Sequence, residues 1–103
     1  MAFIRISLMT PRPDKEEELA NLLDSLVEYF HGMPGFIAAY RLSGDQHSTD
    51  KRTGRLSIWE SEAHANRMSS DEHDFALQAE IKLLAIDTTH EEHSFTGTVP
   101  NGG

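Results

Sequence analysis

The sequence contains no cysteine, only four prolines, and no hydrophobic run longer than a few residues. The lack of cysteine excludes a disulfide framework, a thiolate metal site and a cysteine nucleophile, so we expect the reducing environment of the cytoplasm. At the N-terminus, the apolar residues 1–4 are followed at once by Arg5. We therefore expect neither a signal-peptide core nor a membrane span.

Positive charge is also scarce, because 9 Lys plus Arg stand against 17 Asp plus Glu, for a formal net charge of -8. Binding to a phosphate backbone usually needs several Lys or Arg contacts, and here only Lys51 and Arg52 are adjacent. We expect no nucleic-acid and no membrane partner. The length of 103 residues suits one domain, which we predict to span residues 1–99, with residues 100–103 as a flexible tail.

The first third of the chain predicts a strand and a helix. Apolar and polar residues alternate over residues 3–9, which is typical of a strand with two different faces. Asp14, with Glu17 three residues later, predicts a capping box at the start of a helix. Gly32 suits the left-handed conformation that ends such a helix. The apolar residues between them have helical spacing and predict one buried stripe: Leu19, Leu22, Leu23, Leu26, Val27 and Phe30.

Two further strands are expected in the middle of the chain. Residues 36–42 are almost wholly apolar, which favours a strand that is dry on both faces. Residues 43–52 are polar throughout and predict a long hairpin connection to a strand over residues 53–60.

The C-terminal part predicts two helices and a last strand. Ser61 is a suitable cap for a short helix that runs to about Ser69. Ser70 and Asp71 begin another helix, and residues 88–99 have β-branched character. On the second of these helices we predict one buried face: Phe75, Ala79, Leu83 and Ile86.

The resulting order β-α-β-β-α-α-β predicts a ferredoxin-like α+β domain with a four-stranded antiparallel sheet and helices on one side. If the first and third strands are neighbours, one sheet face is aliphatic and the other is mixed. Both faces carry bulky groups, so a dimer that packs sheet on sheet is expected. The aliphatic face comprises Ile4, Ile6, Leu8, Leu56 and Ile58; the mixed face comprises Arg5, Ser7, Met9, Arg55, Ser57 and Trp59.

Several short motifs resemble those of the antibiotic biosynthesis monooxygenase family of dimeric α/β-barrel proteins. They are Pro34-Gly35-Phe36, then Tyr40 and Leu42, then residues 59–63 (WESEA) and residues 70–73 (SDEH). The resemblance extends from residue 3 to about residue 97. It implies a homodimer whose two sheets close a barrel, with a pocket in each subunit between the sheet and the helices.

The resemblance also implies a chemistry, because this family includes cofactor-independent oxygenases of aromatic polyketide-type substrates. Such a pocket needs a base, donors that stabilise a phenolate or enolate, and a dry wall, but no cofactor and no metal. On this basis we expect Trp59 to stack on a planar ligand, His73 to act as a base and Arg5 to bind an anionic group of the ligand. The residues expected to contact a small aromatic substrate are Ser7, Tyr40, Arg41, Arg55, Ser57, Met68 and Phe75.

Two departures from the family pattern bear on function. Many relatives carry a histidine where this chain has Met68, and the haem-degrading branch uses an asparagine where this chain has Arg5. Haem degradation is therefore disfavoured, and haem binding ranks third among the functions considered. The second is a non-enzymatic dimer that binds a small molecule or serves as an accessory subunit.

Ordinary structural roles compete with the functional ones. Packing is the commoner role for an aromatic residue such as Trp59. The resemblance implies that the mixed face meets the helices and the aliphatic face meets the partner sheet. The opposite assignment, with the aliphatic face under the helices, is the usual hydrophobic-core expectation. Buried Arg5 and Arg55 could pair with helix carboxylates such as Glu28 or Glu80. A metal site at His90 and His93 is not expected, because positions i and i+3 of a strand point to opposite faces.

Overall fold

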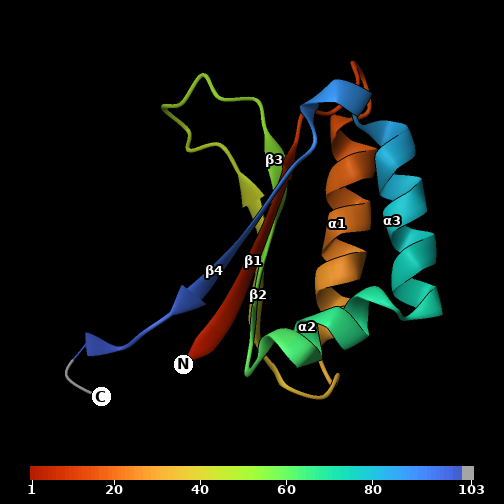
Figure 1. Ribbon diagram of the computed structural model, residues 1–103. Helices are drawn as coiled ribbons and strands as arrows, with labels where there is room; N and C mark the ends of the chain where they lie inside the picture. The colour runs from red at the N-terminus through yellow and green to blue at the C-terminus, as the bar shows by residue number, and fades with distance from the viewer. Residues whose placement is uncertain (101–103) are drawn as a thin grey trace.

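A single antiparallel sheet with all the helices on one side makes up the structure (Figure 1). The computed structural model describes residues 1–100; residues 101–103 of the expected tail lie outside the described residues. Its strands lie in the order β2-β3-β1-β4. This confirms the predicted ferredoxin-like α+β fold. The elements are β1 (Ala2–Met9), α1 (Glu16–Phe30), β2 (Phe36–Ser43), β3 (Thr53–Trp59), α2 (Glu62–Ser69), α3 (Glu72–Leu84), the short 3-10 helix η1 (Asp87–Thr89) and β4 (Glu91–Gly97).

Helix α1 supplies most of the apolar core. Leu19, Leu23, Leu26 and Phe30 are buried on one side of it, as the helical spacing predicts. The predicted capping box is wrong, because Lys15 occupies the cap position and makes no side-chain cap hydrogen bond. Asp14 has a φ of 65° in the preceding turn, so it lies one residue before the helix cap.

The sheet presents its mixed face to the helices. Arg5 lies opposite Ser57, and Ser7 lies opposite Arg55, in the β1–β3 pairing. The Arg5 guanidinium contacts α2 through Ser69 and Asn66, and the Arg55 guanidinium lies over the ring of Phe30 in α1. The usual expectation of an aliphatic face under the helices is therefore wrong here, and the mixed face meets the helices.

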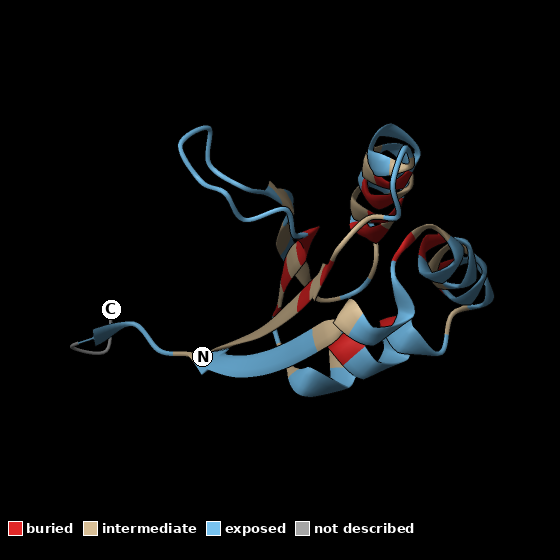
Figure 2. Ribbon diagram, turned by 90° about the horizontal axis from the view of Figure 1, so that it is seen from above, coloured by how far each residue is buried: buried red, intermediate tan, exposed pale blue. Residues whose placement is uncertain are grey.

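The aliphatic side of the sheet is consequently left open. Figure 2 shows the buried residues gathered between the sheet and the helices. On the open side, Tyr40 and Phe95 are exposed beside partly exposed aliphatic residues. We call this surface the open face: Ile4, Ile6, Leu8, Leu56, Ile58, Ala38, Tyr40, Leu42 and Phe95. The expectation that β2 is dry on both sides is not met within one chain, since Ile37 and Tyr40 are exposed.

Helix α3 is turned differently from the prediction. Phe75 and Leu83, which the helical spacing places in the core, are 72% and 73% exposed, and Ile86 beyond the helix is also exposed. Asp74 and Ile81 are buried in their place. The physical reason is the polarity of the sheet face below, which accommodates a helix side that carries a carboxylate. Within residues 1–100, no helix is both long and apolar enough to cross a membrane.

Gly35 joins two of the motifs singled out in the sequence. It has a φ of +77°, a conformation that favours glycine, and its carbonyl accepts a hydrogen bond of 2.8 Å from the Glu60 backbone N–H. A Cβ atom at this position would collide with the side chain of His64 in α2. The turn after α1 is thereby fitted against the start of α2, next to Trp59.

This contact predicts different effects for two glycine substitutions. Gly32 also has a positive φ, +86°, but a methyl group at this position would have no neighbour within 4 Å. We expect Gly32→Ala to lower the free energy of unfolding by about 1 kcal/mol through backbone strain, and Gly35→Ala to lower it further through the collision with His64. Urea unfolding will measure both variants.

The double variant Gly35→Ala/His64→Gly, compared with His64→Gly alone, provides the control for this comparison. Removing the whole His64 side chain, including its Cβ atom, should bring the cost of Gly35→Ala close to that of Gly32→Ala. Equal costs for the two single variants would show that the His64 contact contributes nothing.

Candidate functional site

A polar cavity of about 160 Å³ lies between the sheet and helices α2 and α3. We call it the polar pocket. Strands β1, β3 and β4 all contribute to it, and α3 provides the opposite wall. Its lining residues are Ser7, Arg55, Ser69, Asp74, Phe75, Gln78, Lys82, His90 and Glu92.

Arg55 and Asp74 are the two most deeply buried charged groups of this pocket, at 6% and 4% exposure. Among the described residues, no hydrogen bond or ion pair to the Arg55 guanidinium is formed; it lies 5.4 Å from the ring centre of Phe30. The Oδ1 atom of Asp74 is likewise buried with no hydrogen-bond partner within residues 1–100. Buried polar groups are normally satisfied, so two incomplete ones in one cavity indicate a place for a ligand.

Burial governs the ionisation of both groups. It raises the pKa of Asp74, against the opposing attraction of Arg55. It also lowers the pKa of Arg55, although Asp74 and Glu92 act in the other direction. Since the usual pKa of a guanidinium is far above neutral, Arg55 remains a cation, and the pocket carries fixed positive charge.

The imidazole of His90 lines the same cavity. Its Nε2 atom is 2.8 Å from Ser7 Oγ, and either atom can donate in this hydrogen bond according to the tautomer of the ring. An imidazole nitrogen within reach of a ligand can act as a general base, so His90 is placed to accept a proton from a bound molecule.

The space around Trp59 is almost filled. The indole packs edge-on against Phe30 and Phe36, with ring centres 5.5 and 5.6 Å apart, and only about 10 Å³ remains beside it. Ser57 and Met68 line this remnant. Trp59, at 2% exposure, therefore performs the packing role that competes with ligand binding.

The two arginines do not have the carboxylate partners considered from the sequence. Arg5 donates to Ser69 Oγ at 3.2 Å and to Asn66 Oδ1 at 3.1 Å, in place of Glu28 or Glu80. For Arg55, the nearby carboxylates that influence its ionisation are Asp74 and Glu92. Arg5 lines the small space beside Trp59, whereas Arg55 lines both that space and the polar pocket.

Three expected site residues lie elsewhere. His73 is exposed at the start of α3, with its ring 4.2 Å from that of Tyr29. Tyr40 pairs with Leu56 on the open face, on the other side of the sheet from Arg55. Arg41 forms an ion pair of 2.6 Å with Asp24 of α1. The structure thus does not bring these three side chains to the polar pocket.

Sequence patterns do not single out Asp74, Gln78 or His90 as site residues. Asp74 and Gln78 fall on a helical stripe with Ile81, and this stripe is less apolar than the one predicted for the core. An acidic residue in the first turn of a helix is also easily explained by the helix dipole alone. The sequence pattern places His90 within the last strand, whereas it precedes β4 at the end of η1.

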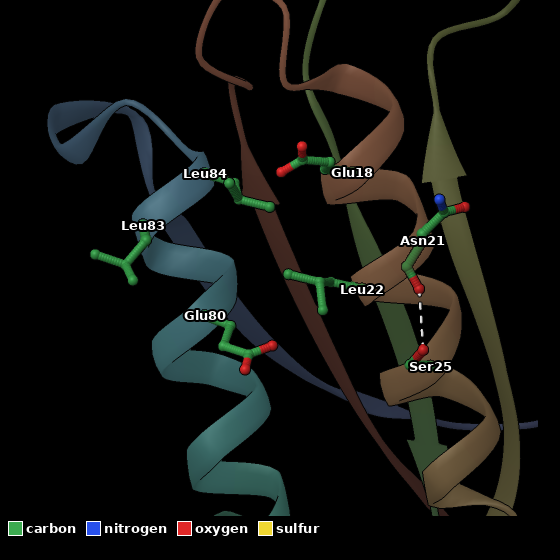
Figure 3. Close-up of a pocket in the computed structure, with 7 residues that line it drawn as sticks. All are labelled: Glu18, Asn21, Leu22, Ser25, Glu80, Leu83 and Leu84. Atoms are coloured by element: carbon green, nitrogen blue, oxygen red, sulfur yellow. Dashed lines mark hydrogen bonds between the residues drawn. The ribbon is translucent and has the colours of Figure 1, made fainter.

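A larger groove of about 440 Å³ runs between α1 and α3 (Figure 3). Leu22 and Leu84 point toward each other across it, and Glu18 and Glu80 also point into it. Leu83 points away from α1. This groove lies on the outer surface of the helices and shares no lining residue with the polar pocket.

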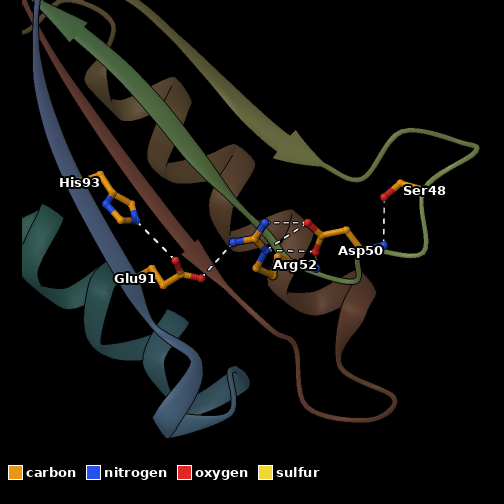
Figure 4. Close-up of polar contacts among 5 residues, drawn as sticks. All are labelled: Ser48, Asp50, Arg52, Glu91 and His93. Carbon is orange, nitrogen blue, oxygen red and sulfur yellow. Dashed lines mark hydrogen bonds and ion pairs between the residues drawn. The ribbon is translucent and has the colours of Figure 1, made fainter.

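An exposed ion network ties the long β2–β3 loop to β4 (Figure 4). Arg52 donates to Asp50 at 2.8 Å and to Glu91 at 3.0 Å. The hydrogen bonds and charge of Arg52 lower the pKa of Asp50 to about 2. His93 lies 3.4 Å from Glu91 on the open side of the sheet, whereas His90 lies on the helix side. No group of three His, Asp or Glu side chains in the described part of the chain could hold a metal ion.

Comparisons with known proteins match the domain over most of its length. The family described as antibiotic biosynthesis monooxygenase matches residues 2–79. No curated protein matches the chain with significant similarity.

Three solved structures illustrate the likeness in fold. Rv0793 from Mycobacterium tuberculosis has a TM-score of 0.83 at 14% identity, over 98% of this chain and 99% of that one. SnoaB from Streptomyces nogalater, a cofactor-independent oxygenase, has a TM-score of 0.79 at 17% identity, over 97% and 98% of the two chains. PA3566 from Pseudomonas aeruginosa has a TM-score of 0.77 at 17% identity, over 95% of each.

The burial of Asp74 predicts a pH-dependent effect of Asp74→Asn. A carboxyl group whose pKa is raised by folding contributes stability that is present below its ordinary pKa of 3.8 and is lost as the pH rises through the folded value. We therefore expect the stability of the wild type, relative to that of the variant, to fall as the pH rises from about 4 to about 7.

Urea unfolding of both proteins across this range will measure the difference. A difference that stays constant would show that attraction to Arg55 balances burial, and one that grows in favour of the wild type would show that it outweighs burial.

Proposed function

The chain belongs to the antibiotic biosynthesis monooxygenase family, and on this basis we propose that its polar pocket is a cofactor-independent oxygenase site for a small, electron-rich aromatic hydroxy compound. The observation that carries the proposal is Arg55, a buried cation with no hydrogen bond or ion-pair partner among the described residues. The likeness in fold to SnoaB, a cofactor-independent oxygenase, supports the same class of reaction.

The volume of the pocket supports a ligand of one aromatic ring. An apolar cavity of about 150 Å³ engineered in another protein holds benzene. The polar pocket, at about 160 Å³, is of similar size and adds polar groups around the ring. We therefore take a dihydroxybenzene (hydroquinone) as the simplest substrate consistent with it.

Each polar group then has a defined part in the reaction. One hydroxyl of the hydroquinone gives its proton to His90, and the resulting phenolate is held by Arg55. The second hydroxyl donates a hydrogen bond to the Asp74 carboxylate, which lines the pocket. Ser7 keeps the imidazole of His90 in position through their 2.8 Å hydrogen bond.

The phenolate is the electron donor in the oxidation. It transfers one electron to O₂, the radical pair combines to form a carbon–oxygen bond, and the hydroperoxide loses water. The net reaction, hydroquinone plus O₂ to hydroxyquinone plus water, is balanced without an external reductant. Arg55 favours it because a preorganised cation stabilises the oxyanion without reorientation.

The packing of Trp59 favours a second candidate function, a dimer that binds a small molecule without turnover. The indole is enclosed by Phe30 and Phe36 and so is not available for stacking on a ligand. Saturable binding of a hydroquinone with no O₂ uptake would support this alternative. The polar pocket has about the volume of one aromatic ring, so it does not support haem binding.

The open face supports a homodimer as the functional unit. Monomeric proteins rarely expose large contiguous apolar patches, and here aliphatic residues of β1 and β3 lie beside exposed Tyr40 and Phe95. We propose that a second copy covers this face, sheet on sheet. The polar pocket lies on the other side of the sheet and stays accessible.

Replacing Arg55 tests the proposed chemistry. We expect Arg55→Met to reduce the rate of O₂ uptake with 2-methylhydroquinone by about a hundredfold, because the loss of one oxyanion donor typically has this effect. An oxygen electrode will measure the rate in the presence of a metal chelator. Arg67→Met, which removes an exposed arginine of α2, is the matched control and should keep the wild-type rate. Wild-type rates in the Arg55 variant, with both variants folded, would exclude this role.

Charge placed on the open face tests the assembly. We expect Ile6→Glu to convert the dimer into a monomer, since a buried carboxylate at a sheet interface is strongly unfavourable. Light scattering coupled to size-exclusion chromatography will give the mass. Leu83→Glu, at an exposed leucine on the helix side, should leave the dimer intact. A monomeric wild type would contradict the proposal.

A further inference from the structure

We propose that the polar pocket continues into an apolar subsite, so that the ligand is a phenolic ring that carries an apolar chain. This inference rests on the proposed function, because it takes the phenolic head to lie at Arg55. It adds a class of substituent that neither the family nor the similar structures assign.

The subsite is a groove of about 340 Å³ beside the polar pocket. We call it the tail groove. The two spaces share Gln78, Lys82 and His90, so they meet along the inner side of α3 and at the start of β4. A molecule anchored at Arg55 can therefore extend past His90 without leaving the protein surface.

The walls of the tail groove suit an alkyl chain. Met9, Ile81 and Ala85 are buried core residues that line it, and Ile86, 36% exposed, forms its outer edge. An alkyl chain that enters this groove leaves water and covers the exposed side chain of Ile86, which favours binding. Among the described residues the polar pocket has, by contrast, only Phe75 as an apolar lining residue.

One edge of the groove is polar. Asp87 lines it and forms an ion pair of 3.5 Å with Arg12, whose Nε atom also donates to the Leu83 carbonyl at 3.1 Å. The groove therefore combines apolar walls with one polar edge at this pair.

The position of the groove favours a ligand chain as its occupant over a second copy of the protein. Met9 lies on the helix side of the sheet, whereas the open face proposed to meet the second copy is on the other side. The continuity with the polar pocket gives the chain a fixed starting point at the ring.

A series of 3-alkylphenols from 3-methylphenol to 3-pentylphenol tests the inference by equilibrium dialysis, because the ring position para to the phenol oxygen is the one proposed to face Asp74. Each buried CH₂ group should tighten binding to the wild type about fourfold. Arg55→Met should weaken every member by the same factor and leave this dependence on chain length unchanged, since the ring and the chain occupy different parts of the site.

Two substitutions that each add one negative charge test where the alkyl chain of the ligand binds. Ile86→Glu should abolish the gain in affinity with chain length, and Leu83→Glu, an exposed position outside the tail groove, should preserve it. Ile86→Gln is the milder second variant and should reduce the gain without adding a charge. Measurements on the wild type alone show whether the affinity depends on chain length.

The outcomes separate the two proposals. Equal affinity for all the phenols, or an unchanged gain in Ile86→Glu, would overturn the tail groove and leave the phenol site in place. Failure of every phenol to bind would overturn the phenol site and its extension together.

Discussion

The mixed face of the sheet, which lies under the helices, is the feature on which the rest of the structure depends. Ser7 and Arg55 lie opposite each other on β1 and β3, and both are buried. A buried guanidinium needs an opposite charge or hydrogen-bond acceptors nearby. Helix α3 supplies Asp74 to this region, which requires that the helix turn its less apolar side inward. Phe75 and Leu83 face solvent as a consequence.

This arrangement also determines what lies outside the domain. Because the mixed side of the sheet meets the helices, the aliphatic side has no cover within one chain. The same alternation that brings Arg55 inward places Leu56 and Ile58 outward. The proposed pocket and the proposed dimer contact are thus two results of one choice of sheet face, and neither can be changed without the other.

Much of the fold could be predicted from local patterns. The leucine stripe of α1, the Ser61 cap of α2, whose side chain accepts from the His64 N–H, and the left-handed Gly32 all act over a few residues. The prediction of a cap at Asp14 was wrong because that residue adopts a left-handed backbone conformation, which its side-chain type permits but does not require. The prediction of the buried side of α3 was wrong because that side depends on what the helix packs against.

The order of the elements, the two-sided pattern of the strands and the family of the chain follow from the sequence alone, since each depends on residues close together or on motifs in a constant order. The covered side of the sheet and the set of residues that share the pocket follow only from the packing of the elements. Ser7, Arg55, Asp74 and His90 come from four separate segments, and His73 is turned away although Asp74 is its neighbour. Adjacent residues on a helix point about 100° apart, so a site assembled between elements depends on how each helix is rotated against the sheet.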